Sequence, residues 1–202
     1  ILQYRGHIES FIQIHPDFST SLVPLKIPGP VPNIVADMLD ASHRAGVGPM
    51  AAVAGAIADY VGHDLLHYSK EIIVENGGDI FIQTHQPVNI AIFANRSPLS
   101  MHIGLEIDCF DGPMAVCTSS GTVGHSISFG KADAVTVVSK SCPLADAAAT
   151  AIANRVQQKA DIQEAIDFGR KIKGVIGLVI IKNEKAGMWG DINVVQLQQN
   201  NG

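Results

Sequence analysis

The sequence predicts an α+β fold in which helices cover a largely antiparallel sheet. Helix and strand patterns are segregated along the chain rather than alternating, and most neighbouring strand patterns are separated by short turns, which favours antiparallel pairing. The 202 residues are 47% hydrophobic and 16% charged, which excludes a disordered chain and is enough to build a large core. Because no internal repeat or low-complexity linker is visible, we expect residues 1–202 to form a single domain.

The N-terminal part is predicted to contain one strand and two helices. Residues 8–14 alternate in part between apolar and polar side chains, which is the pattern of a strand. Apolar residues then follow Pro32 at helical spacing as far as Gly46, and a second helix is expected from Pro49 past Tyr60. Small residues surround this second helix on all sides, so neighbouring elements can pack very close to it.

Strands dominate the middle of the chain and helices return near its end. The middle strands are predicted at residues 71–74, 80–84, 88–93, 103–109, 114–118 and 134–139. A third helix is expected over 143–160, and a fourth from Asp161 to near Gly169, with Glu164 at capping-box spacing. Residues 175–181 and 189–197, around a turn at 183–187, are predicted to form a closing hairpin.

The charge and cysteine content restrict the partners and the compartment. Lys and Arg number 14 against 19 Asp and Glu, and aromatic residues are only 5%, which argues against a nucleic-acid partner. The three cysteines, Cys109, Cys117 and Cys142, form no CxxC pair and fit a reducing compartment better than a disulfide framework. The chain begins at Ile1, and no signal peptide, lipobox cysteine or bilayer-long apolar stretch is visible. We therefore expect a cytoplasmic protein with no membrane span.

Two segments come close to known motifs without meeting their requirements. His63 and His67 lie one helical turn apart, as in a zinc-protease helix, but Asp64 stands where glutamate is needed and no third ligand follows. We interpret both histidines as polar residues at a helix end. The segment 124–131 has five residues between its glycines instead of four, and Ala132 follows its lysine, so it is not a nucleotide-triphosphatase phosphate loop.

Two loops carry candidate ligand chemistry. The turn Asn76-Gly77-Gly78-Asp79 is equally consistent with an ordinary hairpin and with a bare backbone that a phosphate or ribose approaches, with Asp79 organising the ligand. The segment 117–126 is rich in hydroxyl groups, which either stabilise their own turn or bind an anion. Its His125 is the best-placed acid–base group of the chain.

A third candidate lies on the predicted third helix. Asp146 and Thr150 are spaced by four residues and share one helix face. Asp146 either complements the helix dipole or joins Thr150 as a hard oxygen ligand of the kind that suits Mg²⁺.

Three segments, taken in order, resemble the ApbE family, whose members are Mg²⁺-dependent FAD:protein FMN transferases with a T-fold-like architecture. They read AGAIAD at 54–59, VENGGDI at 74–80 and ADAAATA at 145–151. The stretch Thr118-Ser119-Ser120-Gly121 resembles the family's TSG segment, and His125 resembles the histidine after it. The pattern TSSGTVGHSxSFGKADA at 118–134 is similar to that of a shorter branch of uncharacterised prokaryotic ApbE-like proteins. The resemblance covers residues 31–160.

The resemblance implies a metal site, a flavin site and a catalytic residue. Asp146 and Thr150 would supply side-chain ligands to Mg²⁺, and Ala51 its backbone carbonyl. FAD or a related flavin would lie against Gly77, Gly78, Asp79, Thr118, Ser119, Ser120 and Gly121. His125 is the candidate catalytic residue. In the transferase reaction Mg²⁺ neutralises the pyrophosphate while a Thr or Ser of an acceptor protein attacks the FMN phosphorus.

Two positions depart from the transferase pattern. Ala54 stands where the pattern has lysine, and Gly48 falls near the expected acid, so two charges are missing from the implied nucleotide site. The leading hypothesis is a protein that binds a divalent metal and a small phosphate-bearing, flavin-type ligand, with FMN transfer left open. The alternatives are a non-catalytic flavin- or nucleotide-binding protein, a different Mg²⁺-dependent enzyme that uses His125, and a structural or assembly subunit. An acceptor protein and a homo-oligomer are also left open.

Overall fold

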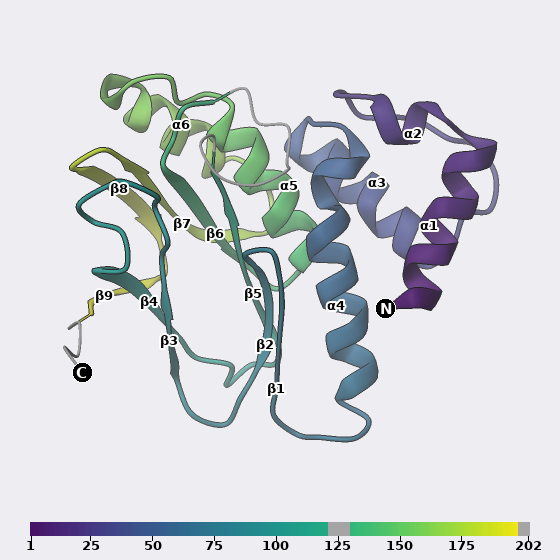
Figure 1. Cartoon of the computed structure of the whole chain (residues 1–202), viewed down its shortest axis with the longest axis horizontal. Helices are drawn as coiled ribbons and strands as arrows, with labels where there is room; N and C mark the ends of the chain where they lie inside the picture. The colour runs from purple at the N-terminus through teal and green to yellow at the C-terminus, as the bar shows by residue number, and fades with distance from the viewer. Residues whose placement is uncertain (121–129, 198–202) are drawn as a thin grey trace.

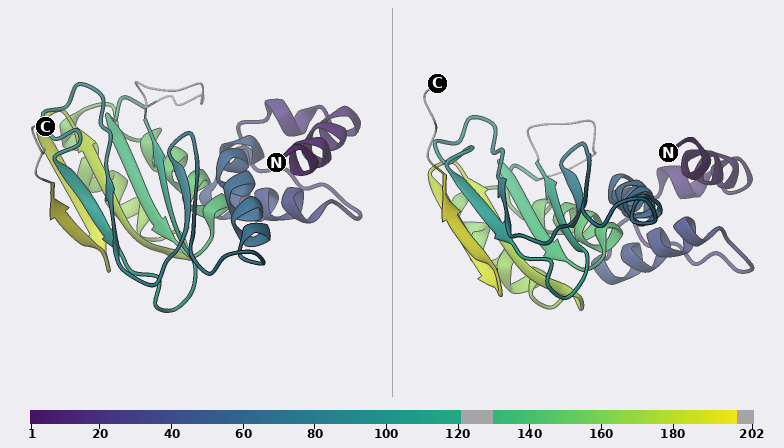
Figure 2. Two further views of the ribbon diagram at one scale, coloured as in Figure 1. Left: turned by 60° about the horizontal axis from the view of Figure 1, so that its bottom comes forward. Right: turned by 90° about the horizontal axis from the view of Figure 1, so that it is seen from below.

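In the computed structural model, which describes residues 1–120 and 130–197, helices cover one face of a six-stranded sheet and a three-stranded sheet packs on its other face (Figure 1). The helices are α1 (Leu2–Ile14), α2 (Asp17–Thr20), α3 (Asn33–Ala45), the 3₁₀ turn η1 (Pro49–Ala52), α4 (Val53–Leu65), α5 (Cys142–Ala153), the 3₁₀ turn η2 (Lys159–Asp161) and α6 (Ile162–Gly169). The strands are β1 (Ile72–Asn76), β2 (Asp79–Gln83), β3 (Val88–Ala91), β4 (Ile103–Ile107), β5 (Met114–Ser119), β6 (Ala134–Ser139), β7 (Val175–Lys182), β8 (Lys185–Gly190) and β9 (Asn193–Gln196). Figure 2 shows α1 and α2 beyond α3 and α4, away from both sheets.

The strand order is β1-β2-β5-β6-β7-β8 in the larger sheet and β3-β4-β9 in the smaller one. Every described pair of neighbouring strands is antiparallel. The predicted α+β class with a largely antiparallel sheet covered by helices is therefore confirmed.

The side chains of the central strands point alternately to the two faces of the larger sheet, and this divides the hydrophobic core into two parts. In β5, Ala115 and Cys117 face the helices, whereas Val116 faces the smaller sheet. The neighbouring strand β6 is buried on both faces, because one set of its side chains packs on helices and the other on β4. Helix α5 lies against β5 and β6 and is almost completely buried, which explains why it consists largely of alanine.

The predicted strand at residues 8–14 is wrong, because this segment lies within helix α1. Its inward side chains are Ile8 and Phe11, with Tyr4 and Ile12 partly buried beside them. This spacing has the period of a helix, and the partial alternation within seven residues concealed it. The short helix α2 was not predicted.

Two predicted boundaries near the third and fourth helices also need correction. Helix α5 ends at Ala153 instead of residue 160, and the backbone N–H of Lys131 donates to the Val156 carbonyl just beyond it. The capping box forms between Gln158 and Asp161 at η2, one turn before the predicted pair Asp161 and Glu164. The chain thus changes direction between α5 and α6, where a continuous helix was expected.

The predicted closing hairpin is only partly correct. Strands β7 and β8 pair as expected, from Gly177 with Gly190 to Lys182 with Lys185. Gly190 has a φ of 105°, and the chain then leaves this sheet so that β9 pairs with β4 in the smaller one. The remaining predicted helices and the six middle strands are present, with small differences at their ends.

Candidate functional site

A cavity of about 610 Å³ lies between α2 and α5, over η1, on which both helices pack. Its described lining residues come from the end of α2, η1 and the residues before it, the start of α4, and α5: Ser19, Thr20, Ser21, Leu22, Val47, Gly48, Met50, Ala51, Val53, Ala54, Asp146, Thr150 and Asn154. The three residues implied as metal ligands, Ala51, Asp146 and Thr150, are all among them. Ala54 and Gly48, which depart from the transferase pattern, line the same cavity.

Two hydrogen bonds from backbone N–H groups to carboxylates link helices α4 and α5. The Oδ2 atom of Asp146 in α5 accepts a hydrogen bond of 2.9 Å from the backbone N–H of Gly55, near the start of α4. Asp59 in α4 accepts one of 3.3 Å from the backbone N–H of Cys142, the first residue of α5. Because the first N–H groups of a helix lack partners within it, each carboxylate satisfies a donor of the other helix and complements its dipole. Asp146 therefore has a structural role besides any role toward a ligand.

Gly55 allows the two helices to approach this closely. A Cβ atom on Gly55 would lie 2.8 Å from the Cβ of Asp146 and closer still to the carbonyl oxygen of Cys142. We expect Gly55→Ala to lower the free energy of unfolding by about 1–3 kcal/mol, the usual cost of overpacking. Gly6→Ala is the matched control, because Gly6 also lies within a helix but has open space around it. That control is expected to raise stability by about 0.5–1 kcal/mol. Urea unfolding measures both changes, and equal effects would show that the helix contact does not require Gly55.

Asp146 is the only charged side chain among the described residues that line the cavity. Burial raises its pKa well above the usual range and the nearby Asp79 raises it further, while the backbone N–H groups of Gly55 and Ala54 act in the opposite direction. A carboxyl group in this environment favours either a bound proton or a bound cation. Thr150, one turn further along α5, and the Ala51 carbonyl add neutral oxygen atoms of the kind that Mg²⁺ accepts.

The glycine hairpin between β1 and β2 lies next to the start of α4. The side chain of Asn76 donates a hydrogen bond of 3.0 Å to the carbonyl of Ala54. Gly77 and Gly78 have φ angles of 68° and 102°, so this turn favours glycine at both positions. The backbone N–H of Thr118 donates to the Gly78 carbonyl at 3.1 Å, which brings the end of β5 beside the hairpin. The two candidate flavin loops therefore meet beside the cavity, although none of their residues belongs to its described lining.

Two buried oxygen atoms at this end of the larger sheet, Asp79 Oδ1 and Ser119 Oγ, have no hydrogen-bond partner within residues 1–120 and 130–197. Asp79 is paired with Cys117 across β2 and β5, and Ser119 lies on the same face of β5, two residues after Cys117. Burial raises the pKa of Asp79 to about 7, although hydrogen bonds from the Cys117 thiol and the Thr118 backbone act to lower this pKa. Buried oxygen atoms without partners, within electrostatic range of Asp146, suit a site that receives a cation or the donors of a ligand.

The other predicted flavin and catalytic residues are placed differently. The Thr118 hydroxyl lies 2.9 Å from that of Thr136, on the face of β5 opposite to Cys117 and Ser119. Ser120 is the last residue described before the gap, and Gly121 and His125 lie outside the described residues.

The histidines near the end of α4 belong to no cluster of metal ligands. No group of three or more His, Cys, Asp or Glu side chains that could hold a metal occurs in the part of the chain that the structure describes. His63 packs on the Phe81 ring, with ring centroids 4.9 Å apart, and its Nδ1 atom lies 2.9 Å from the Asp59 carbonyl. A metal held by described residues therefore needs a mixed donor set, such as Asp146, Thr150 and the Ala51 carbonyl.

Sequence reasoning missed the cavity wall formed by residues 19–22. A Cβ atom on Gly48 would lie 3.1 Å from the Leu22 Cα and closer still to the carbonyl oxygen of Ser21. Gly48 thus has no room for a side chain, because this wall occupies the space. The hydroxyl run Ser19-Thr20-Ser21 was a visible signal, but its contact with Gly48 is not local in sequence.

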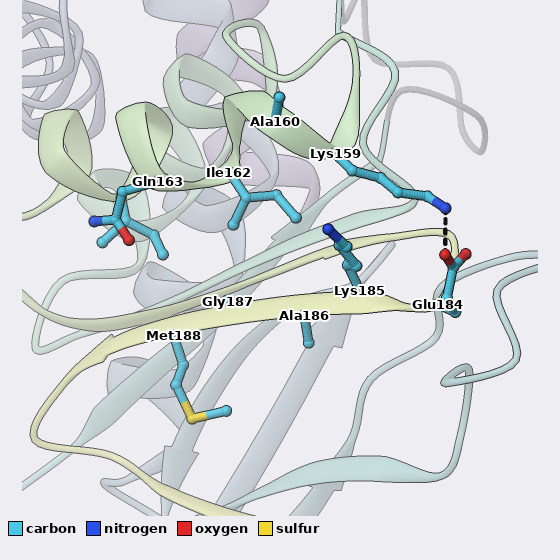
Figure 3. A pocket seen from close by; sticks show the side chains of 10 residues that line it. Lys159, Ala160, Ile162, Gln163, Glu184, Lys185, Ala186, Gly187 and Met188 are labelled. Carbon is cyan, nitrogen blue, oxygen red and sulfur yellow. Dashed lines mark hydrogen bonds and ion pairs between the residues drawn. The ribbon is translucent and has the colours of Figure 1, made fainter.

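A second, open groove of about 540 Å³ lies between α6 and the edge strand β8 (Figure 3). Lys159 pairs with Glu184 at one end of it, and Met188 lies at the other. Its lysines are surface residues and no residue of the candidate site reaches it. Within the described residues, no single helix is long and apolar enough to cross a membrane, and only the bent pair of α3 with η1 and α4 passes by length and composition.

Comparison with known proteins places this chain in a family. The family model described as AbpE bacteria matches residues 1–188. The chain belongs to this family. A UPF0280 protein of Methanococcus aeolicus is 42% identical over 197 residues, covering 95% of this AbpE-family chain and 79% of the relative. A UPF0280 protein of Methanocella arvoryzae is 44% identical over 191 residues, covering 94% of this chain and 78% of that relative.

The fold is shared with a solved structure at low sequence identity. The ApbE protein of Thermotoga maritima matches with a TM-score of 0.53 and 18% identity, over 70% of this chain and 50% of that chain. The flavin transferase ApbE of Vibrio cholerae matches with a TM-score of 0.47 and 17% identity, over 91% of this chain and 73% of that chain. The matched part spans only half of the Thermotoga protein, and identities this low bear on the fold alone. The predicted ApbE-like, T-fold-like architecture of this family member is confirmed.

Proposed function

We propose that this AbpE-family chain binds a divalent cation, Mg²⁺ first, together with a phosphate-bearing, flavin-type ligand in the cavity between α2 and α5. The main support is that Ala51, Asp146 and Thr150 line one cavity, and that Asp146 is the sole charged side chain of its described lining. A phosphate beside a lone carboxylate would be repelled, whereas a cation between the two is attracted to both. The cavity therefore suits a phosphate ligand that arrives with a metal.

Each residue of the proposed site would have its own task. Asp146, Thr150 and the Ala51 carbonyl would hold the metal, which when bound supplies positive charge against the phosphates. Gly77 and Gly78 leave a backbone without side chains that a phosphate or ribose can approach. Asp79 and Ser119 lie outside the described lining of the cavity. They carry oxygen atoms without partners among the described residues, and these would bond the donors of a ligand that reaches the hairpin.

Transfer of FMN from FAD is proposed to be slow or absent. In that reaction an acceptor Ser or Thr oxygen bonds to the FMN phosphorus, and the bond from that phosphorus to the AMP oxygen breaks. AMP leaves, and the hydroxyl proton passes to a base, for which His125 is our candidate. Ala54 provides no cation, and Gly48 cannot carry an acid because residues 21 and 22 fill the space. These two observations favour flavin binding over efficient transfer.

The test restores one missing charge. We expect Ala54→Lys to tighten binding of FAD roughly tenfold to hundredfold, since a charge-assisted contact with phosphate is worth about 1.5–3 kcal/mol. Flavin fluorescence titration with Mg²⁺ at two salt concentrations measures this, and higher salt should reduce the gain. Ala54→Met is the control of similar length without charge and should gain nothing from the phosphate.

Transfer is measured in parallel as FMN bound covalently to a generic acceptor peptide. Efficient transfer by the wild-type chain would contradict the slow-transfer part of the proposal. No flavin binding by either the wild-type chain or Ala54→Lys would contradict the flavin ligand itself.

A further inference from the structure

We infer that residues 19–22 form the wall of the cavity that selects its ligand, and that Leu22 contacts the ring system of the flavin-type ligand. The inference rests on the proposed function and assigns a specificity-determining residue to a segment outside every motif of the sequence.

The wall is held in place by the N-terminal helices. Phe18 is fully buried, and its ring centroid lies 5.2 Å from that of Phe11 in α1. The backbone N–H of Ser21 donates to the Asp17 carbonyl at 2.9 Å, and the Ser21 hydroxyl donates to the Val23 carbonyl at 2.7 Å. Close contact with Gly48 fixes the wall from the other side. Residues 19–22 are therefore a built part of the cavity.

The two sides of the cavity differ in chemistry. Leu22 and the η1 region supply apolar side chains, chiefly Val47, Met50 and Val53, whereas α5 and the residue after it supply Asp146, Thr150 and Asn154. A ligand with an apolar ring at one end and phosphate at the other uses both sides, and inorganic phosphate uses only the second.

Leu22 presents apolar surface that such a ligand would remove from water. Leu22 lines the cavity and yet is 55% exposed. Covering it with a ring system removes apolar surface of both partners from water. The neighbouring Val23 is 63% exposed and is absent from the described lining, so it provides a matched control.

The experiment titrates FAD and riboflavin, both with Mg²⁺, into the wild-type protein, Leu22→Ala, Leu22→Met and Val23→Ala. Riboflavin carries the same ring without phosphate. Leu22→Ala should weaken the binding of both ligands by about tenfold, because the lost contact is with the shared ring. Leu22→Met, which keeps an apolar side chain, and Val23→Ala should each stay within about twofold of the wild-type protein. Thermal unfolding checks that all variants are folded.

Equal affinities for Leu22→Ala and Val23→Ala would overturn the inference while leaving the proposed function intact. A loss of affinity for FAD without a loss for riboflavin would also overturn it, since the shared ring would then contribute nothing at Leu22. A wild-type protein that binds neither flavin would instead refute the proposed function, and the inference with it.

Discussion

Asparagine in place of Asp79 is expected to reduce the pH dependence of stability of the metal-free protein between pH 5 and pH 8 by about 3 kcal/mol. Burial raises the pKa of Asp79 from 3.8 to about 7. A carboxyl group whose pKa is higher in the folded state holds its proton more tightly when folded. Stability therefore falls as the pH rises from the unfolded pKa to the folded one. The full change corresponds to roughly 4 kcal/mol, of which about 3 kcal/mol falls between pH 5 and pH 8.

Urea unfolding at pH 5 and pH 8 with a chelator present measures this difference. On going to pH 8, the wild-type protein should lose about 3 kcal/mol more than Asp79→Asn does. Both proteins should also share a loss of stability that comes from Asp146, whose pKa is raised well above its usual range. Glu75→Gln, an exposed carboxylate on the same hairpin, should behave as the wild-type protein does. A wild-type profile as flat as that of Asp79→Asn would mean that Asp79 is not held in a dry environment.

Asp146→Asn should abolish the stabilisation of the protein by Mg²⁺ and FAD together. A ligand present at a hundred times its dissociation constant stabilises a folded protein by about 2.7 kcal/mol, and the variant should lose that gain. The physical reason is that asparagine keeps an oxygen to accept the Gly55 N–H but has no negative charge to hold a cation.

Asp59→Asn is the matched control for Asp146→Asn. Asp59 bonds the start of α5 as Asp146 bonds the start of α4, but it does not belong to the described lining of the cavity. Thermal unfolding with and without Mg²⁺ and FAD should therefore show the ligand-dependent shift in Asp59→Asn and not in Asp146→Asn. A full shift in Asp146→Asn would place the metal elsewhere.

Features that depend on local spacing were predicted well from the sequence. Asp146 and Thr150 share a helix face because residues four apart always do, and the structure places both at one cavity. The turn at Gly77 and Gly78 could be predicted from the sequence because backbone positions with positive φ angles favour glycine. The positions of the six middle strands and their antiparallel pairing followed from short connections and alternating side chains, whereas the placement of β3 and β4 in a second sheet was not predicted.

Features that depend on distant contacts were missed. Residues 8–14 are helical because Ile8 and Phe11 pack on other helices, and seven residues hold too little periodicity to show this. Strand β9 joins β4 in a second sheet because Gly190 turns the chain out of the first one. The wall formed by residues 19–22 closes the cavity through its contact with Gly48, which no local pattern encodes.

The most direct test of the metal and flavin site is a crystal structure of the chain with FAD and Mn²⁺ in place of Mg²⁺, since both metals prefer hard oxygen ligands. Anomalous scattering then locates the metal independently of any assumption about the ligand. We expect a manganese peak between the flavin phosphates and the oxygen atoms of Asp146, Thr150 and the Ala51 carbonyl. An ordered flavin with no manganese at these three residues, or manganese bound at a different place, would contradict it.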